Sequence, residues 1–183
     1  MKDRNIKMPK ILIIYSSTDG QTKRICERIK MNSIYNSDTK IISINDASSE
    51  SIIPYGNIVI GASIRYGKHN AKVYEFIKKN KKELQEKNTS FFSVNVVARK
   101  TNKNTPETNP YIRNFLRISN WKPNLLAVFA GKIDYQKYRF FDKQIIRFIM
   151  YITKGPTDTS KAYEFTDWGK VDLFTKTFDK SCI

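Results

Sequence analysis

The chain of 183 residues has little of what builds a disulfide framework, a metal site or a membrane span. Its two cysteines, Cys26 and Cys182, lie far apart, so no zinc-binding spacing is present. We therefore expect no metal, and a reducing compartment is the default. No run approaches the roughly twenty apolar residues that cross a bilayer, and residues 1–9 lack the apolar core of a signal peptide. Any membrane contact is expected to be peripheral.

Acidic residues are also scarce, with 17 Asp and Glu against 33 Lys and Arg, which gives a net charge of +16. Such a charge favours an anionic partner: a membrane surface, a nucleic acid or an acidic small molecule. Lys, Ile and Asn are used heavily throughout, so biased composition accounts for part of this charge. Hydrophobic residues make up 40% of the chain, which predicts a globular protein with a sizeable core.

Two common nucleotide-binding motifs are missing, because the chain has neither Gly-x-Gly-x-x-Gly nor Gly-Lys-Ser/Thr. Instead, the hydroxyl-rich loop Ser16–Thr22 joins an apolar run, Lys10–Tyr15, to Lys23–Lys30, whose apolar residues recur at helical spacing. A loop between a buried strand and a helix presents backbone N–H groups to an anion. The pattern favours a monophosphate site. An ordinary loop whose hydroxyls cap the helix is the alternative.

The rest of the chain alternates strands with helices, which predicts a parallel sheet with helices on both faces. The further predicted strands are Thr39–Ile44, Asn57–Ile60, Ser90–Val94 and Leu125–Gly131. The further predicted helices are Lys68–Glu86, Glu107–Ile118 and about Asp167–Phe178. Ligands of such sheets bind at the carboxyl ends of the strands. We therefore expect three loops to converge around one ligand: Ser16–Thr22, Ala62–Gly67 and Asn95–Arg99.

The first loop resembles the phosphate loop of flavodoxins, which holds the phosphate of FMN, although flavodoxins usually carry Thr where this chain has Asp19. Further segments are similar to the quinone-dependent protoporphyrinogen IX dehydrogenases of bacteria, in which an Asp is usual at this position. These segments are Gly61–Gly67, Ser93–Lys100, Tyr138-Arg139, Thr157-Asp158-Thr159 and Thr166-Asp167-Trp168. The resemblance covers nearly the whole chain, from Lys10 to about Phe178. An acid fits beside a phosphate only if its side chain points away and its N–H alone contributes.

The resemblance implies a flavodoxin-like α/β domain over residues 10–183, preceded by a polar extension over 1–9. Its sheet would be doubly wound, five-stranded and parallel, in the order 2-1-3-4-5, with a long insertion at the fifth strand. It also implies FMN as the cofactor, with no catalytic side chain assigned, because the flavin carries the redox chemistry. The expected cofactor-binding residues are Ser17, Thr18, Asp19, Gly20, Gln21, Thr22, Ser63, Ile64, Arg65, Tyr66, Gly67, Ser93, Asn95, Val96, Val97, Ala98 and Arg99.

Within these loops, Tyr66 is expected to stack on the isoalloxazine ring, and covering a sheet edge is the alternative. Arg99 and Lys100 offer positive charge to a reduced flavin or to an acidic substrate. For Lys100, a solvated surface role is an equal alternative. His69, the only histidine, is interpreted as an exposed residue near a helix start.

The segment from Lys132 to about Tyr163 exceeds what a minimal domain of this kind needs. It resembles the insertion that splits the fifth strand of long-chain flavodoxins. A helix over about Tyr138–Thr153 would gather an apolar side from Phe141, Ile145, Phe148, Ile149 and Ile152, with Lys143, Arg147 and Lys154 towards its flanks. Such a helix is typical of a segment that binds an anionic membrane surface or an apolar substrate. A helix packed on the sheet is the alternative.

The resemblance implies the oxidation of protoporphyrinogen IX to protoporphyrin IX in haem biosynthesis, with electrons passed to a membrane quinone. It places the protein peripherally on the cytoplasmic face of the inner (plasma) membrane. The alternatives are a flavodoxin-type electron carrier, a flavin-dependent quinone reductase without porphyrinogen activity, and a nucleic-acid-binding protein. Carriers are typically acidic, and no nucleic-acid-binding motif is present, so we expect no nucleic-acid partner.

Overall fold

The computed structural model describes residues 9–47 and 52–182, so the expected polar extension lies almost wholly outside the described residues. Five parallel strands form one sheet in the order β2-β1-β3-β4-β5, which confirms the predicted topology. The strands are β1 (Ile11–Ser16), β2 (Thr39–Ser43), β3 (Asn57–Ser63), β4 (Asn88–Val94) and β5 (Leu125–Phe129). Because β1, β3 and β4 are buried along nearly their whole length, they carry apolar side chains on both faces.

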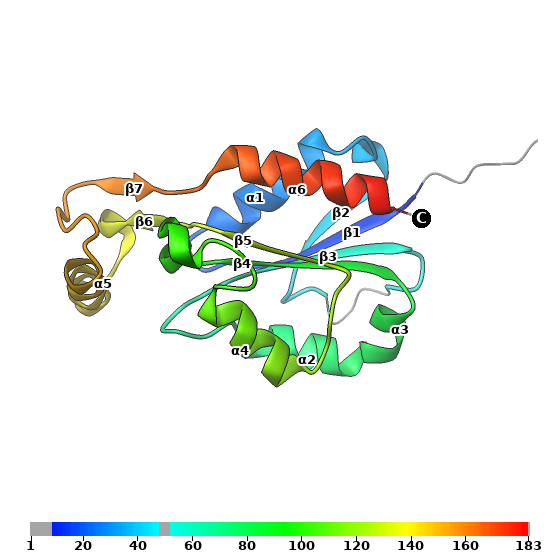
Figure 1. Ribbon diagram of the computed structural model, residues 1–183, viewed down its shortest axis with the longest axis horizontal. Coiled ribbons are helices and arrows are strands. Elements are labelled where there is room, and N and C mark those ends of the chain that lie inside the picture. Colours follow the sequence, from blue (N-terminus) through cyan, green and yellow to red (C-terminus); the bar gives the residue numbers. More distant parts are fainter. Residues whose placement is uncertain (1–8, 48–51, 183) are drawn as a thin grey trace, which may run out of the picture.

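Helices cover both faces of the sheet (Figure 1). On one face lie α1 (Gln21–Asn32) and α6 (Trp168–Ser181), and on the other lie α2 (Ala71–Lys79), α3 (Lys81–Gln85) and α4 (Pro110–Ser119). Short 3₁₀ turns complete the connections at η1 (Asn36–Asp38), η2 (Val96–Arg99), η3 (Thr101–Lys103) and η4 (Tyr135–Lys137). As predicted, Val171, Phe174 and Phe178 of α6 are buried against the sheet.

The helix predicted over Lys68–Glu86 is wrong, because α2 ends at Lys79 and α3 begins at Lys81. The side-chain amide of Asn80 donates to the carbonyl oxygen of Phe76 at 2.8 Å. This local bond competes with helical bonding and ends α2. The residues predicted to form the inner face of this stretch, Val73, Phe76, Ile77 and Leu84, are nonetheless all buried in the core.

The interpretation of His69 as an exposed residue is also wrong, because its ring is buried. The ring packs edge-on against Phe91 and Phe115, and its Nε2 lies 3.0 Å from the Ser93 hydroxyl. Burial lowers the pKa of His69 to about 4, so the ring is neutral at pH 7.

The insertion leaves the sheet after β5 as β6 (Lys132–Asp134), continues as α5 (Phe140–Ile152) and returns as β7 (Ala162–Glu164). β6 and β7 pair antiparallel as a separate two-stranded sheet. Together with α5 they extend beyond one end of the main sheet, at the left of Figure 1. The helix predicted within the insertion is confirmed. None of the helices within residues 9–47 and 52–182 has the length and hydropathy that crossing a bilayer requires.

Candidate active site between three strand-end loops and the insertion

A cavity of about 350 Å³ lies where the carboxyl ends of β1, β3 and β4 meet the insertion. The three predicted loops all contribute to it, and so does α5. The predicted residues that line it are Ser17, Thr18, Asp19, Gln21, Thr22, Ser63, Ile64, Arg65, Tyr66, Gly67, Asn95, Val96 and Val97. The fold therefore brings together thirteen residues that lie in three separate parts of the sequence.

The first loop ends at the N-terminus of α1, which no side chain caps and whose first turn carries no acid. Gly20 adopts a φ of +88°, which an L side chain rarely takes, and this conformation turns the chain into the helix. The hydroxyl of Thr22 is fully buried and has no hydrogen-bond partner among the described residues. Uncapped N–H groups and an unsatisfied buried hydroxyl suit a phosphate, which accepts hydrogen bonds and is favoured by the helix dipole.

The carboxylate of Asp19 turns away from this helix end. Its Oδ2 accepts hydrogen bonds from the Tyr138 hydroxyl at 3.2 Å and from the Arg65 guanidinium at 3.3 Å. An acid in the loop is therefore compatible with a phosphate, because its charge is paired and its N–H stays in place. Burial, together with the Asp19 charge, raises the pKa of Tyr138 to about 12.

The second loop is a tight turn in which Arg65 and Lys68 exchange two backbone hydrogen bonds. Its central residues, Tyr66 and Gly67, have φ values of +49° and +76°. Two positive φ values define a type I′ turn, which suits Asn-Gly better than Tyr-Gly. Tyr66 is thus held in a strained conformation, and the residue is 65% exposed where it lines the cavity. Backbone strain of this kind clusters at active sites and ligand-binding sites, which makes Tyr66 a candidate functional residue.

In the third loop, the buried Asn95 side chain accepts the Ala98 N–H and so fixes the turn that presents Val96 and Val97 to the cavity. Ser93 does not reach the cavity, because it shares a strand face with Phe91 and bonds to His69. Ala98 is buried in the same core as Phe91.

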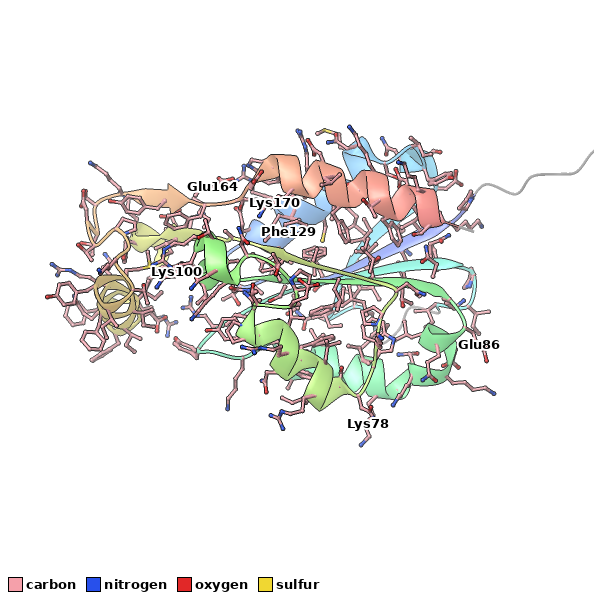
Figure 2. All side chains as sticks on the ribbon, viewed as in Figure 1. Lys78, Glu86, Lys100, Phe129, Glu164 and Lys170 are labelled. Carbon is pink, nitrogen blue, oxygen red and sulfur yellow. The ribbon has the colours of Figure 1, made fainter. Side chains whose placement is uncertain are left out.

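The Arg99 side chain is also directed elsewhere, since its guanidinium donates to the carbonyl and the hydroxyl of Thr153. Lys100, labelled in Figure 2, likewise lies outside the lining, as does Gly20. Four predicted cofactor residues therefore do not line the cavity and instead contribute to the structure of the loops, the core or the insertion: Gly20, Ser93, Ala98 and Arg99.

The insertion supplies a wall that the three loops alone do not predict. Four side chains of α5 line the cavity: Ile145, Ile146, Ile149 and Met150. Further lining residues that the sequence prediction missed are Val94, Tyr111, Gly131, Lys132, Ile133 and Tyr138. The apolar stripe of α5 is the signal that could have found Ile145 and Ile149, because part of it faces the cavity.

Comparison with known proteins decides the family. A model of the flavodoxin domain matches residues 12–160. A Leishmania major protein named protoporphyrinogen IX dehydrogenase (quinone) is 42% identical over 172 residues, which cover 93% of this chain and 74% of that relative. The protein of the same name from Escherichia coli (strain K12) is 40% identical over 171 residues, covering 91% of this chain and 93% of the relative. The chain belongs to this dehydrogenase family.

Solved structures show the same fold at low identity. The oxidised flavodoxin 1 of Bacillus cereus matches with a TM-score of 0.57 and 15% identity, covering 95% of this chain and 99% of that one. A flavodoxin from the domain Archaea matches with a TM-score of 0.52 and 15% identity, covering 94% and 97%. The insertion of this chain is thus added to a flavodoxin-like fold.

The family-like segment Thr166-Asp167-Trp168 ties the returning insertion to the phosphate loop. The Gln21 side-chain amide donates to the Thr166 hydroxyl at 2.8 Å. Glu164, at the end of β7 in Figure 2, accepts hydrogen bonds from Arg24 of α1 and from the Trp168 indole. This segment therefore places the insertion rather than contacting the cavity.

Proposed function

We propose that this protein oxidises protoporphyrinogen IX to protoporphyrin IX with FMN as its cofactor, and that a quinone accepts the electrons. The observation that carries the proposal is the shared cavity, in which an anion loop, two further loops at the strand ends and an apolar wall face one space. Membership of the dehydrogenase family, whose members are named for this substrate and acceptor, supports it.

The chain's own residues supply binding and shape. The hydroxyls of Ser17, Thr18 and Thr22, with the N–H groups of the first turn of α1, would hold the FMN phosphate. FMN, when bound, supplies a two-electron acceptor, so about three turnovers account for a six-electron oxidation. Ile146, Ile149 and Met150 would exclude water and give the apolar tetrapyrrole a matching surface.

Proton transfer is not assigned to a side chain. The lining includes no histidine, cysteine or glutamate among the described residues. Asp19 is paired with Arg65. The pKa of Tyr138 is raised to about 12, so its hydroxyl stays protonated and is not suited to act as a base at neutral pH. The contribution of the chain is therefore to position substrate and cofactor.

We further propose that α5 rests on an anionic membrane surface. Its exposed residues include Phe140, Phe141, Phe148, Tyr151 and Ile152, and such a run of large apolar side chains marks an interaction surface. The side chains of α5 spread outward on the side away from the sheet (Figure 2). The net charge of +16 complements an anionic leaflet, and a bilayer is also where an apolar quinone resides.

Ile145 and Ile149 join this outer surface to the cavity, since both line the cavity and both stay about half exposed. The rim of the cavity would then face the lipid, which gives a quinone direct access. Cys26 and Cys182 are free thiols, which is consistent with a reducing compartment and with the cytoplasmic face of the membrane.

The test of the activity is an anaerobic assay with protoporphyrinogen IX, FMN and a quinone. Ile149→Glu places a charge in the apolar wall and should lower porphyrinogen turnover at least tenfold while FMN stays bound. Ile118→Glu is the matched control, because Ile118 on α4 is equally exposed, at 50% against 49%. If the wild-type protein binds FMN and exchanges electrons without oxidising porphyrinogen, it is an electron carrier.

A further inference from the structure

α5 covers the cavity but is weakly anchored by apolar packing. Met150 is the one side chain of α5 that is fully buried, within a small cluster formed with Ile133, Tyr135 and Tyr138. A helix held by so little core must be placed by its polar contacts. These contacts lie at its two ends.

At the first turn of α5, the Asp142 carboxylate accepts a hydrogen bond from the Arg65 guanidinium at 2.9 Å. Its other oxygen accepts the hydroxyl of Tyr66. Arg65 and Tyr66 both belong to the second flavin loop. The start of α5 is therefore fixed to the loop that forms the opposite rim of the cavity.

Arg65 also joins α5 to the phosphate loop. Besides Asp142, it donates to Asp19, and its guanidinium lies 5.0 Å and 5.1 Å from the ring centroids of Tyr66 and Tyr138. Asp19 in turn accepts the Tyr138 hydroxyl, just before α5 begins. One guanidinium thus lies between two carboxylates and two aromatic rings, and each partner comes from an element that surrounds the cavity.

We propose that Asp19 is a positioning residue for the reaction. Its carboxylate holds the insertion in place and does not bind the phosphate, because it bonds to Tyr138 and Arg65. Through Arg65 it fixes the position of the start of α5. The cavity wall formed by Ile145, Ile146 and Ile149 is thereby held at a fixed distance from the three loops at the strand ends. This role rests on the proposed function for its effect on turnover, but not for its effect on α5.

The observations that favour this role over phosphate binding are geometric. Both of the Asp19 contacts run to residues outside the phosphate loop, and neither partner belongs to α1. A negative side chain next to a phosphate also repels it, so a carboxylate retained there needs another partner. The Asp19–Arg65–Asp142 arrangement supplies one, because two carboxylates share one guanidinium.

The experiment compares the wild-type protein with Asp19→Asn, Asp142→Asn and the double variant. Asn keeps the size of Asp and its backbone N–H, but it is uncharged. Hydrogen–deuterium exchange over 140–152 should rise at least fivefold in each single variant. The double variant should add little, because both carboxylates act through Arg65. Asp172→Asn is the matched control, since Asp172 of α6 pairs with Arg28 of α1 rather than with the insertion and should leave exchange over 140–152 unchanged.

FMN affinity separates the two possible roles of Asp19. We expect Asp19→Asn to bind FMN as tightly as wild type or more tightly, because a negative charge near the phosphate is lost, while kcat/KM for porphyrinogen falls at least tenfold. Weaker FMN binding with unchanged exchange over 140–152 would overturn the proposal. If Asp19→Asn does not fold, Asp142→Asn decides through the same exchange and affinity measurements. If wild type has no porphyrinogen activity, the proposed function fails while exchange still tests the anchoring of α5.

Discussion

The guanidinium of Arg99 donates hydrogen bonds to both the carbonyl oxygen and the hydroxyl of Thr153, at 2.9 and 2.7 Å. Thr153 follows the last residue of α5, where helix carbonyls lack intrahelical partners and the dipole is negative. A residue of the third flavin loop therefore closes the far end of the insertion helix. Arg99 also donates to the Val96 carbonyl, so it fixes its own loop with the same group.

Arg99→Lys should loosen the last turn of α5 without affecting FMN. Lysine keeps the charge but loses the fork that reaches Thr153 and Val96 together. We expect the free energy of unfolding to fall by about 1–2 kcal/mol, with faster hydrogen exchange over 149–153 and an FMN Kd within twofold of wild type. Arg113→Lys, on the exposed face of α4, is the control. A large loss of FMN affinity with unchanged exchange would restore Arg99 to the flavin site.

Thr22→Val should have opposite effects on the FMN-free and FMN-bound protein. Without a phosphate, the buried hydroxyl has no partner among the described residues, so replacing it with a methyl group should raise the free energy of unfolding by about 1 kcal/mol. With FMN, the variant loses a hydrogen bond to a charged group, and the Kd should rise about tenfold. Thr175→Val is the matched control, because its buried hydroxyl already donates to the Val171 carbonyl. Equal FMN affinity in both variants would place the phosphate elsewhere.

His69 should make the stability depend on pH between about 6.5 and 4. Its pKa is lowered to about 4 by burial, so the unfolded chain takes up a proton on this ring before the folded protein does. The contribution is fully present above pH 6.5 and is lost as the pH falls to 4, by roughly 3 kcal/mol in all. Carboxylates also titrate there, so the measurement is the difference between wild type and His69→Gln in denaturant unfolding at several pH values. Parallel pH profiles would contradict the neutral, buried ring.

The sequence reveals elements whose signals are local. Runs of apolar residues predict the strands. The loops that follow these strands contain most of the residues that line the cavity, because parallel strands end at the same edge of the sheet. The side-chain contacts of Arg99 and Asp19 could not be predicted for a different reason: their partners, Thr153 and Tyr138, lie 54 and 119 residues further along the chain. No local pattern reports such contacts.

Ser93 shows a second limit of sequence reasoning. Along β4, side chains alternate between the two faces, so Ser93 faces the same layer as Phe91, beneath α4. As a serine, Ser93 suggested a polar contact to the cofactor. Its position along the strand instead directs its hydroxyl to the ring of His69. The burial of His69 was missed because the neighbours that bury it, Phe91 and Phe115, come from elements distant in the sequence.

Tyr66→Asn tests whether this ring serves the flavin. Asn adopts a positive φ more readily than Tyr, so relief of backbone strain should offset the lost bond to Asp142, and the free energy of unfolding should change by less than about 1 kcal/mol. If the ring stacks on the isoalloxazine, the FMN Kd should rise at least fivefold, whereas Tyr66→Phe should keep it. Unchanged affinity in Tyr66→Asn would mean that the ring covers a sheet edge instead.

The outer face of α5 should bind anionic vesicles. Phe141 and Phe148 are 79% and 63% exposed, and neither lines the main cavity, so replacing both with Ser should leave the fold and FMN binding intact. Each ring adds roughly 1.5–3 kcal/mol if it is fully buried in the interface. The double variant should therefore lose sedimentation with anionic liposomes and reduce a vesicle-bound quinone more slowly, and salt should weaken binding of the wild type.

The control for this last prediction is Leu173→Ser on α6, since Leu173 is 65% exposed but belongs to a helix that covers the main sheet and not to α5. It should sediment like wild type, which separates a specific surface from general loss of apolar area. A thermal melt of each variant completes the comparison. If the Phe141 and Phe148 double variant still sediments but melts much earlier, its rings stabilise the fold and the membrane proposal is wrong. If the double variant sediments less but melts at the wild-type temperature, the two rings contact the lipid, because membrane binding is lost while the stability of the fold is unchanged.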